Sequence, residues 1–245
     1  MNRERIESKD NQRLKLVRKL RLKKNRYKEA KFVIESRKLV EEAIKSGLQI
    51  DFIILKDSLD NEFANFDLAY VSDQLFSTIT EMTNPDGYLA VVKMPSMNNA
   101  PASRILLLDG LQDPGNLGTI IRSAEAFGFN SIVLVNSVDP YNEKTLRAAM
   151  GSLFRLDIRM VERVDLPAFL KPYTVYVADM DGEDYRKLSY DSKVCLVIGN
   201  EANGVSRELF ERADKRISIP MKGELESLNA AISASLIMSA IDSSL

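Results

Sequence analysis

The chain has 245 residues, of which 45% are apolar and 28% charged, proportions typical of globular proteins. It contains no histidine and one cysteine, which excludes Ser-His-Asp and Cys-His catalysis, most zinc sites and an intrachain disulfide. Because no apolar run could cross a membrane and the N-terminus is too polar for a signal peptide, we expect a cytoplasmic protein with no membrane contact and no metal.

The net charge of −1 is divided unevenly along the chain. Residues 1–31 hold 13 Lys and Arg against 4 Asp and Glu, a net charge of +9, so the remaining residues carry a net charge of −10. A basic arm on an acidic body favours a polyanionic partner, most simply nucleic acid. The alternative is a solvated, Lys-rich helix, and the charge pattern leaves both interpretations open.

The first 94 residues alternate between helical and extended patterns. Apolar residues among basic ones predict an amphipathic basic helix over residues 9–24. Strands are predicted at 31–35, 51–55, 70–71 and 88–93, and helices at 37–46 and about 73–80. Ser36 can cap the first of these two helices, Gly47 can end it, and Ser72 or Asp73 can cap the second. We therefore expect a small α/β domain over residues 1–94.

The segment 95–103 is polar, contains two prolines and shows no periodicity, which is typical of a linker. A second domain, residues 104–245, follows. Its strands are predicted at 105–109, 131–136, 154–159, 173–179, 193–198 and 216–219, and its helices near 117–128, 142–150, 204–213 and 227–242. This alternation favours a mostly parallel sheet covered by helices on both faces. Cys195 lies within one strand, where core packing is favoured over thiol chemistry.

Three loops of the second domain follow strands and are rich in Gly, Asn, Ser and Glu. They run from 112 to 118, from 199 to 204 and from 221 to 229. Ligands of parallel sheets bind where the loops at the carboxyl ends of strands converge. Each loop alone is better explained as a turn, but the three together favour a binding pocket. The first loop matches neither GxGxxG nor GxxxxGK[ST], so it does not indicate a dinucleotide or P-loop site.

The segments NLGTIIRSAEAFGF, LVIGNEANGVS and ISIPMKGELESLNAAISA resemble, in order and spacing, the signature motifs of SpoU-type (TrmH-like) RNA ribose 2′-O-methyltransferases, members of the SPOUT superfamily. The segment DPYNEKTLRAAMGSLFRLDI is also similar to the family. In the first domain, FVIE and TNPDG resemble a ribosomal-protein-like RNA-binding domain that many members carry, although members often have Glu-Gly where this chain has Glu35-Ser36.

The resemblance implies an α/β fold whose C-terminal SPOUT domain is threaded into a deep trefoil knot. It also implies S-adenosylmethionine as the cofactor, a homodimer formed through the knotted domain, and methyl transfer to a ribose 2′-hydroxyl of structured RNA. Ribosomal RNA is favoured over transfer RNA because of the additional front domain. Two alternatives are a non-catalytic RNA-binding or assembly protein and a nucleotide-dependent oxidoreductase, and the missing GxGxxG argues against the second.

The family pattern also assigns roles to individual positions. Cofactor contacts are expected at Gly199, Ile219 and Leu228, and the catalytic set is expected to comprise Asn116, Arg122, Glu201, Ser227 and Asn229. Independently of the family pattern, the charge of the basic arm predicts contacts between RNA phosphates and Arg13, Arg18, Lys19, Lys23 and Lys24. One face of the last helix, Leu228, Ile232, Ser235, Leu236 and Ser239, is expected to be core or a dimer interface.

Four of the five catalytic positions also have a plainer explanation. Arg122 could pair with Glu125 on the helix surface, but we expect it to hold a phosphate and stabilise a developing oxyanion, because a guanidinium stays protonated. Asn116 could be a left-handed turn residue rather than orient Arg122 or the ribose. Glu201 could be a solvated carboxylate rather than a partner of Arg122 or of the pocket, and Ser227 could be the N-cap of the last helix.

Overall fold

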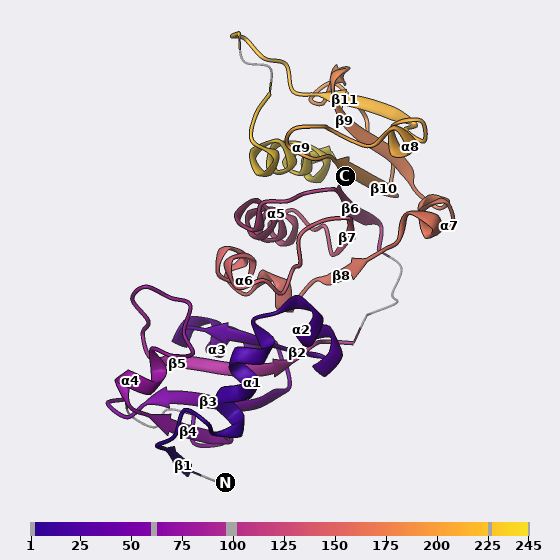
Figure 1. Ribbon diagram of the computed structural model, residues 1–245. Helices are drawn as coiled ribbons and strands as arrows, with labels where there is room; N and C mark the ends of the chain where they lie inside the picture. The colour runs from indigo at the N-terminus through magenta and orange to yellow at the C-terminus, as the bar shows by residue number, and fades with distance from the viewer. Residues whose placement is uncertain (1–2, 60–62, 97–101, 225–226, 245) are drawn as a thin grey trace. The chain divides into compact units, whose positions relative to one another are not determined.

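The computed structural model describes residues 3–59, 63–96, 102–224 and 227–244, and the chain forms two compact units (Figure 1). Unit 1 comprises Met1–Ser96 and Tyr141–Phe154, and unit 2 comprises Met97–Pro140 and Arg155–Leu245. Most of the predicted linker, residues 97–101, lies outside the described residues. A short segment from the second half of the sequence is therefore part of the first unit.

Unit 1 is built on a five-stranded mixed sheet with the order β1-β4-β3-β5-β2. Its strands are β1 (Arg3–Ile6), β2 (Lys31–Glu35), β3 (Ile50–Lys56), β4 (Leu68–Val71) and β5 (Tyr88–Lys93). Its helices are α1 (Gln12–Leu20), α2 (Lys23–Glu29), α3 (Arg37–Lys45), α4 (Asp73–Phe76) and α6 (Glu143–Ala149), and η1 (Ser152–Phe154) is a 3₁₀ turn. The four predicted strands are confirmed, whereas the short strand β1 was not expected from the sequence.

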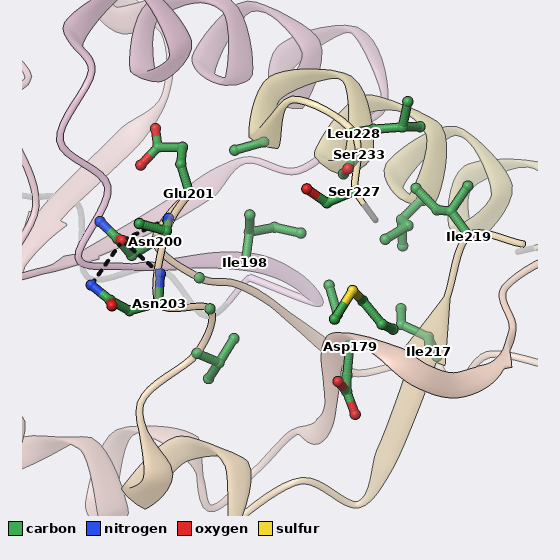
Figure 2. A pocket seen from close by; sticks show the side chains of 18 of the residues that line it. Asp179, Ile198, Asn200, Glu201, Asn203, Ile217, Ile219, Ser227, Leu228 and Ser233 are labelled. Carbon is green, nitrogen blue, oxygen red and sulfur yellow. Dashed lines mark hydrogen bonds between the residues drawn. The ribbon is translucent and has the colours of Figure 1, made fainter. Parts of the chain in front are cut away.

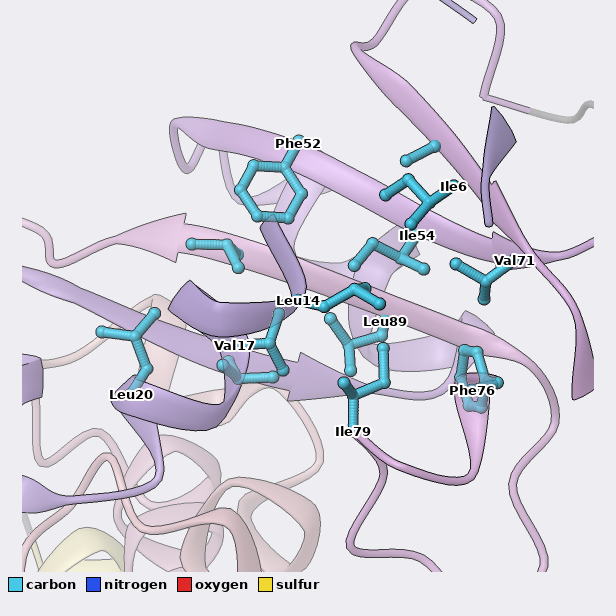
Figure 3. Packing of buried hydrophobic residues seen from close by; sticks show 13 residues of the cluster. Ile6, Leu14, Val17, Leu20, Phe52, Ile54, Val71, Phe76, Ile79 and Leu89 are labelled. Atoms are coloured by element: carbon cyan, nitrogen blue, oxygen red, sulfur yellow. The ribbon is translucent and has the colours of Figure 1, made fainter. Parts of the chain in front are cut away.

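The apolar side of α1 packs against this sheet (Figure 3). Leu14, Val17 and Leu20 are buried and recur with helical spacing, so they lie on one side of the helix. The side chains that they meet come mainly from the strands: Ile6, Phe52, Ile54, Val71 and Leu89. One side of α1 is therefore part of the hydrophobic core, and its opposite side is the part that a polyanion could reach.

The single helix predicted over residues 9–24 is wrong, because the chain breaks it into α1 and α2. Leu22 is extended, with φ −90° and ψ 127°. The guanidinium of Arg26, which is buried, donates hydrogen bonds to the carbonyl oxygens of Leu20 at 2.9 Å and Arg21 at 2.8 Å. The last carbonyl groups of a helix have no hydrogen-bond donor within that helix. If α1 continued, backbone nitrogens of the next turn would bond these two carbonyls; here Arg26 does so instead. A side chain from the following helix thus ends the first one.

An ion-pair network and an aromatic contact hold the segment containing α6 in unit 1. Arg21 bonds the buried carboxylate of Glu35 at 2.7 Å and also the carboxylate of Glu143 in α6. Burial raises the pKa of Glu143, against the opposing influence of the neighbouring guanidinium. The ring of Tyr141 lies 4.8 Å from that of Phe32, centroid to centroid. Two elements distant in sequence are thereby joined through charge and aromatic packing.

Ser36 starts α3 with φ 111° and ψ 148°, a backbone conformation that favours glycine. Its hydroxyl accepts a hydrogen bond from the backbone nitrogen of Leu39 at 3.3 Å, so the predicted N-cap is confirmed. Glycine at this position would relieve the strain, which should stabilise the folded state by about 1–3 kcal/mol. Two effects oppose it: the weaker cap costs a few tenths of a kcal/mol, and the greater freedom of the unfolded chain costs about 0.5–1 kcal/mol. We therefore expect Ser36→Gly to raise the free energy of unfolding by about 1 kcal/mol.

Urea unfolding of the wild type, Ser36→Gly and Ser36→Ala checks this expectation. Alanine removes the capping hydroxyl but keeps the strain, so Ser36→Ala should be the least stable of the three proteins. A Ser36→Gly protein that unfolds at lower urea than the wild type would show that the hydroxyl outweighs the strain.

Unit 2 contains a six-stranded sheet with the order β11-β9-β10-β6-β7-β8, in which every neighbouring pair is parallel. The strands are β6 (Arg104–Asp109), β7 (Ser131–Val135), β8 (Asp157–Met160), β9 (Thr174–Asp184), β10 (Val194–Ile198) and β11 (Lys215–Ser218). The helices are α5 (Pro114–Ala126), α7 (Leu166–Leu170), α8 (Arg207–Phe210) and α9 (Ala230–Ser244), with the 3₁₀ turn η2 (Arg163–Asp165). The predicted parallel sheet is confirmed.

Helices cover both faces of this sheet, as predicted (Figure 1). On one face Leu166 of α7 and Leu209 of α8 pack in one cluster with the strand residues Leu107 and Val197. On the other face α5 and α9 pack against each other, and α9 contacts β10. Both faces are therefore buried, which explains why the strands read as continuous apolar runs rather than alternating ones. In the described part of the chain, no helix has the length and apolarity needed to span a membrane.

Candidate functional site

The three Gly- and Asn-rich loops lie at one edge of the unit 2 sheet. They follow β6, β10 and β11, and the carboxyl ends of parallel strands point to the same edge. β6 and β10 are neighbours, and β9 alone separates β10 from β11. The described parts of the loops, residues 110–118, 199–206 and 219–229 without 225–226, therefore gather at one place.

Side chains from all three loops are joined by two hydrogen bonds. The carboxamide nitrogen of Asn116 donates to Glu201 Oε1 at 3.0 Å, and the carboxamide nitrogen of Asn229 donates to Asn116 Oδ1 at 3.0 Å. Asn116 lies in the first turn of α5, which Asp113 caps by accepting from the Asn116 backbone nitrogen at 2.7 Å. Asn116 is thus helical, and the left-handed turn considered as an alternative is wrong. Glu201, Asn116 and Asn229, three of the predicted catalytic residues, are thus connected in one row of side chains, the polar row.

The last helix holds Asn229 in place from the other side. Its Oδ1 accepts hydrogen bonds from the backbone nitrogens of Ala231 at 2.9 Å and Ile232 at 3.3 Å, so Asn229 caps α9. The expectation that Ser227 is the N-cap is therefore wrong, because α9 begins at Ala230 and Ser227 precedes it by three residues. Since the oxygen of Asn229 is used by the helix, its nitrogen is directed to Asn116.

Arg122 lies apart from this row, on the exposed side of α5. No hydrogen bond or ion pair joins its side chain to any residue in the described ranges. Glu125, its partner in the surface alternative, instead pairs with Arg155, whose Nη2 lies 3.0 Å from Glu125 Oε2. Glu201 is bonded to Asn116 and not to Arg122. The guanidinium of Arg122 is therefore open to a ligand that approaches from solvent.

A cavity of about 540 Å³ lies beside the row and is lined by the second loop, the third loop and the middle of β9 (Figure 2). The three predicted cofactor residues, Gly199, Ile219 and Leu228, all line it, together with the predicted catalytic residues Glu201 and Ser227. Many of its other walls are apolar: Ile198, Val205, Phe210, Ile217 and Met221. The size and lining suit a ligand with a flat, weakly polar ring system.

Gly199 allows the second loop to fold back on its own backbone. A β-carbon at this position would overlap the carbonyl group of Gly204 and the backbone nitrogen of Val205. The loop is closed by two backbone hydrogen bonds of 2.9 Å exchanged between Asn200 and Gly204. The glycine was expected from the sequence to admit a ligand, whereas the tight contact here is with the loop itself.

Sequence reasoning missed Asn200, which organises the second loop. Its carboxamide nitrogen donates to the carbonyl oxygen of Gly110 at 2.8 Å, which ties this loop to the end of β6. Its carboxamide oxygen accepts from the backbone nitrogens of Ala202 at 2.9 Å and Asn203 at 3.0 Å (Figure 2). An asparagine that opens a loop ending in glycine is the sequence signal for such a turn.

A buried carboxylate beneath the loops was also missed. Asp109, at the end of β6, is 2% exposed and accepts hydrogen bonds from Arg163 Nη2 at 2.7 Å and from the Ser206 backbone nitrogen at 2.8 Å. Arg163 Nη1 also donates to the hydroxyl of Ser206 at 2.7 Å. These bonds fix the start of α8 against β6, and so hold the far end of the second loop.

Cys195 is fully buried in β10, and burial raises the pKa of its thiol. The predicted role in core packing is therefore confirmed. In the described ranges, no group of three or more Cys, Asp or Glu side chains is arranged to hold a metal ion.

Three of the five basic residues predicted to bind RNA already have partners within unit 1. Arg13 pairs with Asp67 at 2.8 Å, and Lys19 pairs with Glu29 at 2.5 Å. Arg18 donates to a backbone carbonyl at the start of the arm. These contacts stabilise the fold of the arm, so they reduce the freedom of these side chains to meet phosphates.

Lys23 and Lys24 differ from the other three. Both are exposed on α2, and neither forms an ion pair with a residue that the structure describes. The ammonium nitrogen of Lys23 lies 6.0 Å from the centre of the Tyr27 ring. The cationic surface of the arm is therefore concentrated on α2.

Comparison with known proteins places these features in a family. Residues 103–239 match the model of the SpoU rRNA Methylase family, and residues 11–90 match that of the MRM3-like substrate binding domain. The chain is 39% identical over 243 residues to the Bacillus subtilis 23S rRNA (guanosine(2553)-2′-O)-methyltransferase RlmP, an alignment covering 95% of this chain and 97% of that protein.

Solved structures are similar over nearly the whole chain. The AdoMet-bound rRNA methyltransferase from Sinorhizobium meliloti superimposes with a TM-score of 0.88 at 29% identity, covering 98% of this chain and 97% of that one. The SpoU methyltransferase AviRb from Streptomyces viridochromogenes has a TM-score of 0.84 at 24% identity, covering 95% of this chain and 97% of that one, a likeness of fold.

Proposed function

This chain belongs to the SpoU rRNA methylase family, and we propose that it transfers a methyl group from S-adenosylmethionine to a ribose 2′-hydroxyl of ribosomal RNA. The observation that carries the proposal is the arrangement at the sheet edge. A ligand-sized cavity lies beside a row of amide and carboxylate side chains contributed by all three loops. The similarity to the Bacillus subtilis enzyme supports a guanosine of 23S rRNA as the nucleotide that is modified.

The residues around the cavity fit S-adenosylmethionine. Ile219 and Leu228 supply apolar walls for the adenine, and Gly199 presents loop backbone without a side chain. The hydroxyl of Ser227 lines the same cavity and can bond a polar part of the cofactor or the ribose. When bound, the cofactor supplies a methyl group attached to a positively charged sulfur. The methyl carbon is therefore open to attack by an oxygen nucleophile.

The polar row is suited to position the RNA ribose. Glu201 and Asn229 fix both ends of the Asn116 carboxamide, so its orientation is set before RNA binds. Arg122 would hold a backbone phosphate of the RNA and stabilise the negative charge that develops on the 2′-oxygen as it attacks the methyl carbon. The proton of the 2′-hydroxyl passes to solvent water. We assign the guanidinium to charge stabilisation, because it does not release its own proton at ordinary pH.

We further propose that the enzyme acts as a homodimer whose subunits meet through α9, and that the C-terminal part of unit 2 forms the trefoil knot of its family. Ile232 and Leu236 support the dimer, because these large apolar residues are exposed four positions apart on α9. A cytoplasmic location follows from the proposed ribosomal RNA substrate.

Methylation of RNA tests the proposed function directly. Purified protein should transfer radiolabelled methyl groups from S-adenosylmethionine to 23S rRNA transcripts, and the 2′-O-methyl site should disappear from cells that lack the gene. Binding of RNA without methyl transfer would favour a non-catalytic assembly protein. Binding of a nicotinamide dinucleotide in place of S-adenosylmethionine would favour an oxidoreductase.

The exposed lysines of α2 should account for part of the salt dependence of RNA binding. Each phosphate contact releases counterions and adds about 0.7–0.9 to the slope of log affinity against log salt. The double substitution Lys23→Gln and Lys24→Gln should therefore flatten that slope by about 1.4–1.8 if both lysines contact phosphates. Titration of RNA at several salt concentrations measures it.

A control with the same loss of charge is Lys9→Gln combined with Lys45→Gln, two exposed lysines away from α2. This protein should keep a slope close to that of the wild type. Equal slopes for the wild type, the α2 variant and the control would mean that the lysines of α2 do not contact RNA phosphates and are only solvated.

A further inference from the structure

The exposed side of α2 carries one aromatic ring among three lysines. At 100° per residue, Lys23, Tyr27, Lys24 and Lys28 follow one another around a continuous arc of the helix. All four are exposed, and Tyr27 is exposed to 41%, which is high for a large aromatic side chain. The remaining helix positions are turned to the protein, with Arg26 buried.

The ring of Tyr27 is held by aromatic contacts that continue into the core of unit 1. Tyr141 meets it edge-on, with ring centres 6.4 Å apart and an interplanar angle of 71°. Tyr141 in turn packs on Phe32, which is fully buried. An exposed ring fixed in this way loses little conformational freedom when a ligand stacks on it.

The lysines around Tyr27 differ from those of α1 in their lack of carboxylate partners among the described residues. Lys23, Lys24 and Lys28 form no ion pair with any residue in the described ranges, whereas Arg13 and Lys19 of α1 are each paired with a carboxylate. A Lys-rich surface helix that served only solubility would not need an exposed, anchored aromatic ring at its centre. Aromatic rings bracketed by unpaired cations are the arrangement with which proteins hold single-stranded nucleic acid.

We propose that Tyr27 stacks on an unpaired base of the RNA substrate, while Lys23, Lys24 and Lys28 contact the phosphates beside that base. The proposal rests on the proposed function, since it names the RNA feature that unit 1 recognises. A base within a duplex has both faces covered by its neighbours, so the ring of Tyr27 requires an unpaired or looped-out base. Unit 1 would thereby distinguish loops from continuous helices, with little preference for sequence.

Two RNA probes test this proposal: a hairpin with 2-aminopurine in its loop, and a fully paired duplex of the same length. Tyr27→Ala should weaken binding of the hairpin by about 5- to 150-fold, the range expected for one stacked base, and leave binding of the duplex within about twofold. Tyr27→Phe should bind the hairpin like the wild type, because it retains the ring. The 2-aminopurine fluorescence should change on binding of the wild type and Tyr27→Phe, and stay constant with Tyr27→Ala.

Tyr27→Leu provides a second variant, in case loss of the contact with Tyr141 unfolds Tyr27→Ala. In every variant, binding of S-adenosylmethionine shows whether unit 2 is folded. Hairpin affinity unchanged in both Tyr27→Ala and Tyr27→Leu would overturn the proposal, and so would an equal loss for hairpin and duplex. If the wild type binds the hairpin through Tyr27 but methylates no ribosomal RNA, the proposed function fails while the stacking stands. If the wild type methylates ribosomal RNA but the Tyr27 variants bind the hairpin normally, the proposed function stands and the stacking proposal fails.

Discussion

Arg122→Ala is expected to lower the rate of methyl transfer by at least about 10²- to 10³-fold, the loss typical when one donor to a developing negative charge is removed. The affinity for S-adenosylmethionine should remain that of the wild type, because Arg122 is exposed on α5 and does not line the cavity. Its side chain has no partner in the described part of the chain, so its removal leaves no buried group unpaired. The effect should therefore appear in catalysis and not in stability.

Single-turnover methylation and calorimetry with S-adenosylmethionine measure the two quantities separately. Arg207→Ala is a matched control, since the side chain of Arg207 is 92% exposed in the same unit and pairs only with the nearby Glu211 in the described structure. Arg122→Lys keeps the charge and loses the forked geometry, so it should recover part of the rate. A large loss of cofactor affinity in Arg122→Ala would mean that this residue belongs to the cofactor side of the site.

Gly199→Val should differ from Arg122→Ala in lowering cofactor affinity, by about 100-fold, as its principal effect. The new side chain cannot coexist with the backbone of Gly204 and Val205, so the second loop must open. Opening the loop displaces the backbone that lines the cavity, together with Glu201 and its bond to Asn116. Cofactor binding and methyl transfer should therefore both fail, in contrast to Arg122→Ala.

The control for this substitution is Gly223→Val, because a β-carbon at Gly223 meets no atom of the described residues within 4 Å and its backbone lies outside the left-handed region. It should bind S-adenosylmethionine normally. Thermal unfolding of both variants separates a local change of the loop from loss of the fold. Wild-type affinity in Gly199→Val would show that the second loop is not needed to hold the cofactor.

The sequence by itself determined the architecture of unit 2 and the place of its site. Strands such as β6 and β10 are continuous apolar runs bounded by turn residues, a local pattern that is visible without partners. Parallel strands then require their following loops to meet at one edge, so the gathering of Gly199, Asn116 and Asn229 could be anticipated. The motif resemblance added the chemistry that periodicity alone does not contain.

The tertiary structure decided which of those side chains work together. The bond between Asn116 and Glu201 joins residues 85 positions apart, and that between Asn116 and Asn229 joins residues 113 positions apart. Spacing along a chain does not report such pairs, because they depend on how strands are ordered in the sheet. For the same reason the sequence did not reveal Asn200, whose partner Gly110 lies 90 positions away.

The same limit applies to the basic arm and to the division into units. Charge counting treated Arg13 and Lys23 alike as RNA-binding cations, and only the fold distinguishes them. Arg13 pairs with Asp67, whereas Lys23 forms no ion pair with a residue that the structure describes. The alternation of strands and helices likewise placed the segment around Glu143 in the second domain, whereas its contact with Arg21 joins it to unit 1. The sequence thus determined the elements and the type of chemistry through local patterns, and the tertiary structure decided the pairings, because ion pairs and hydrogen bonds depend on distances in space.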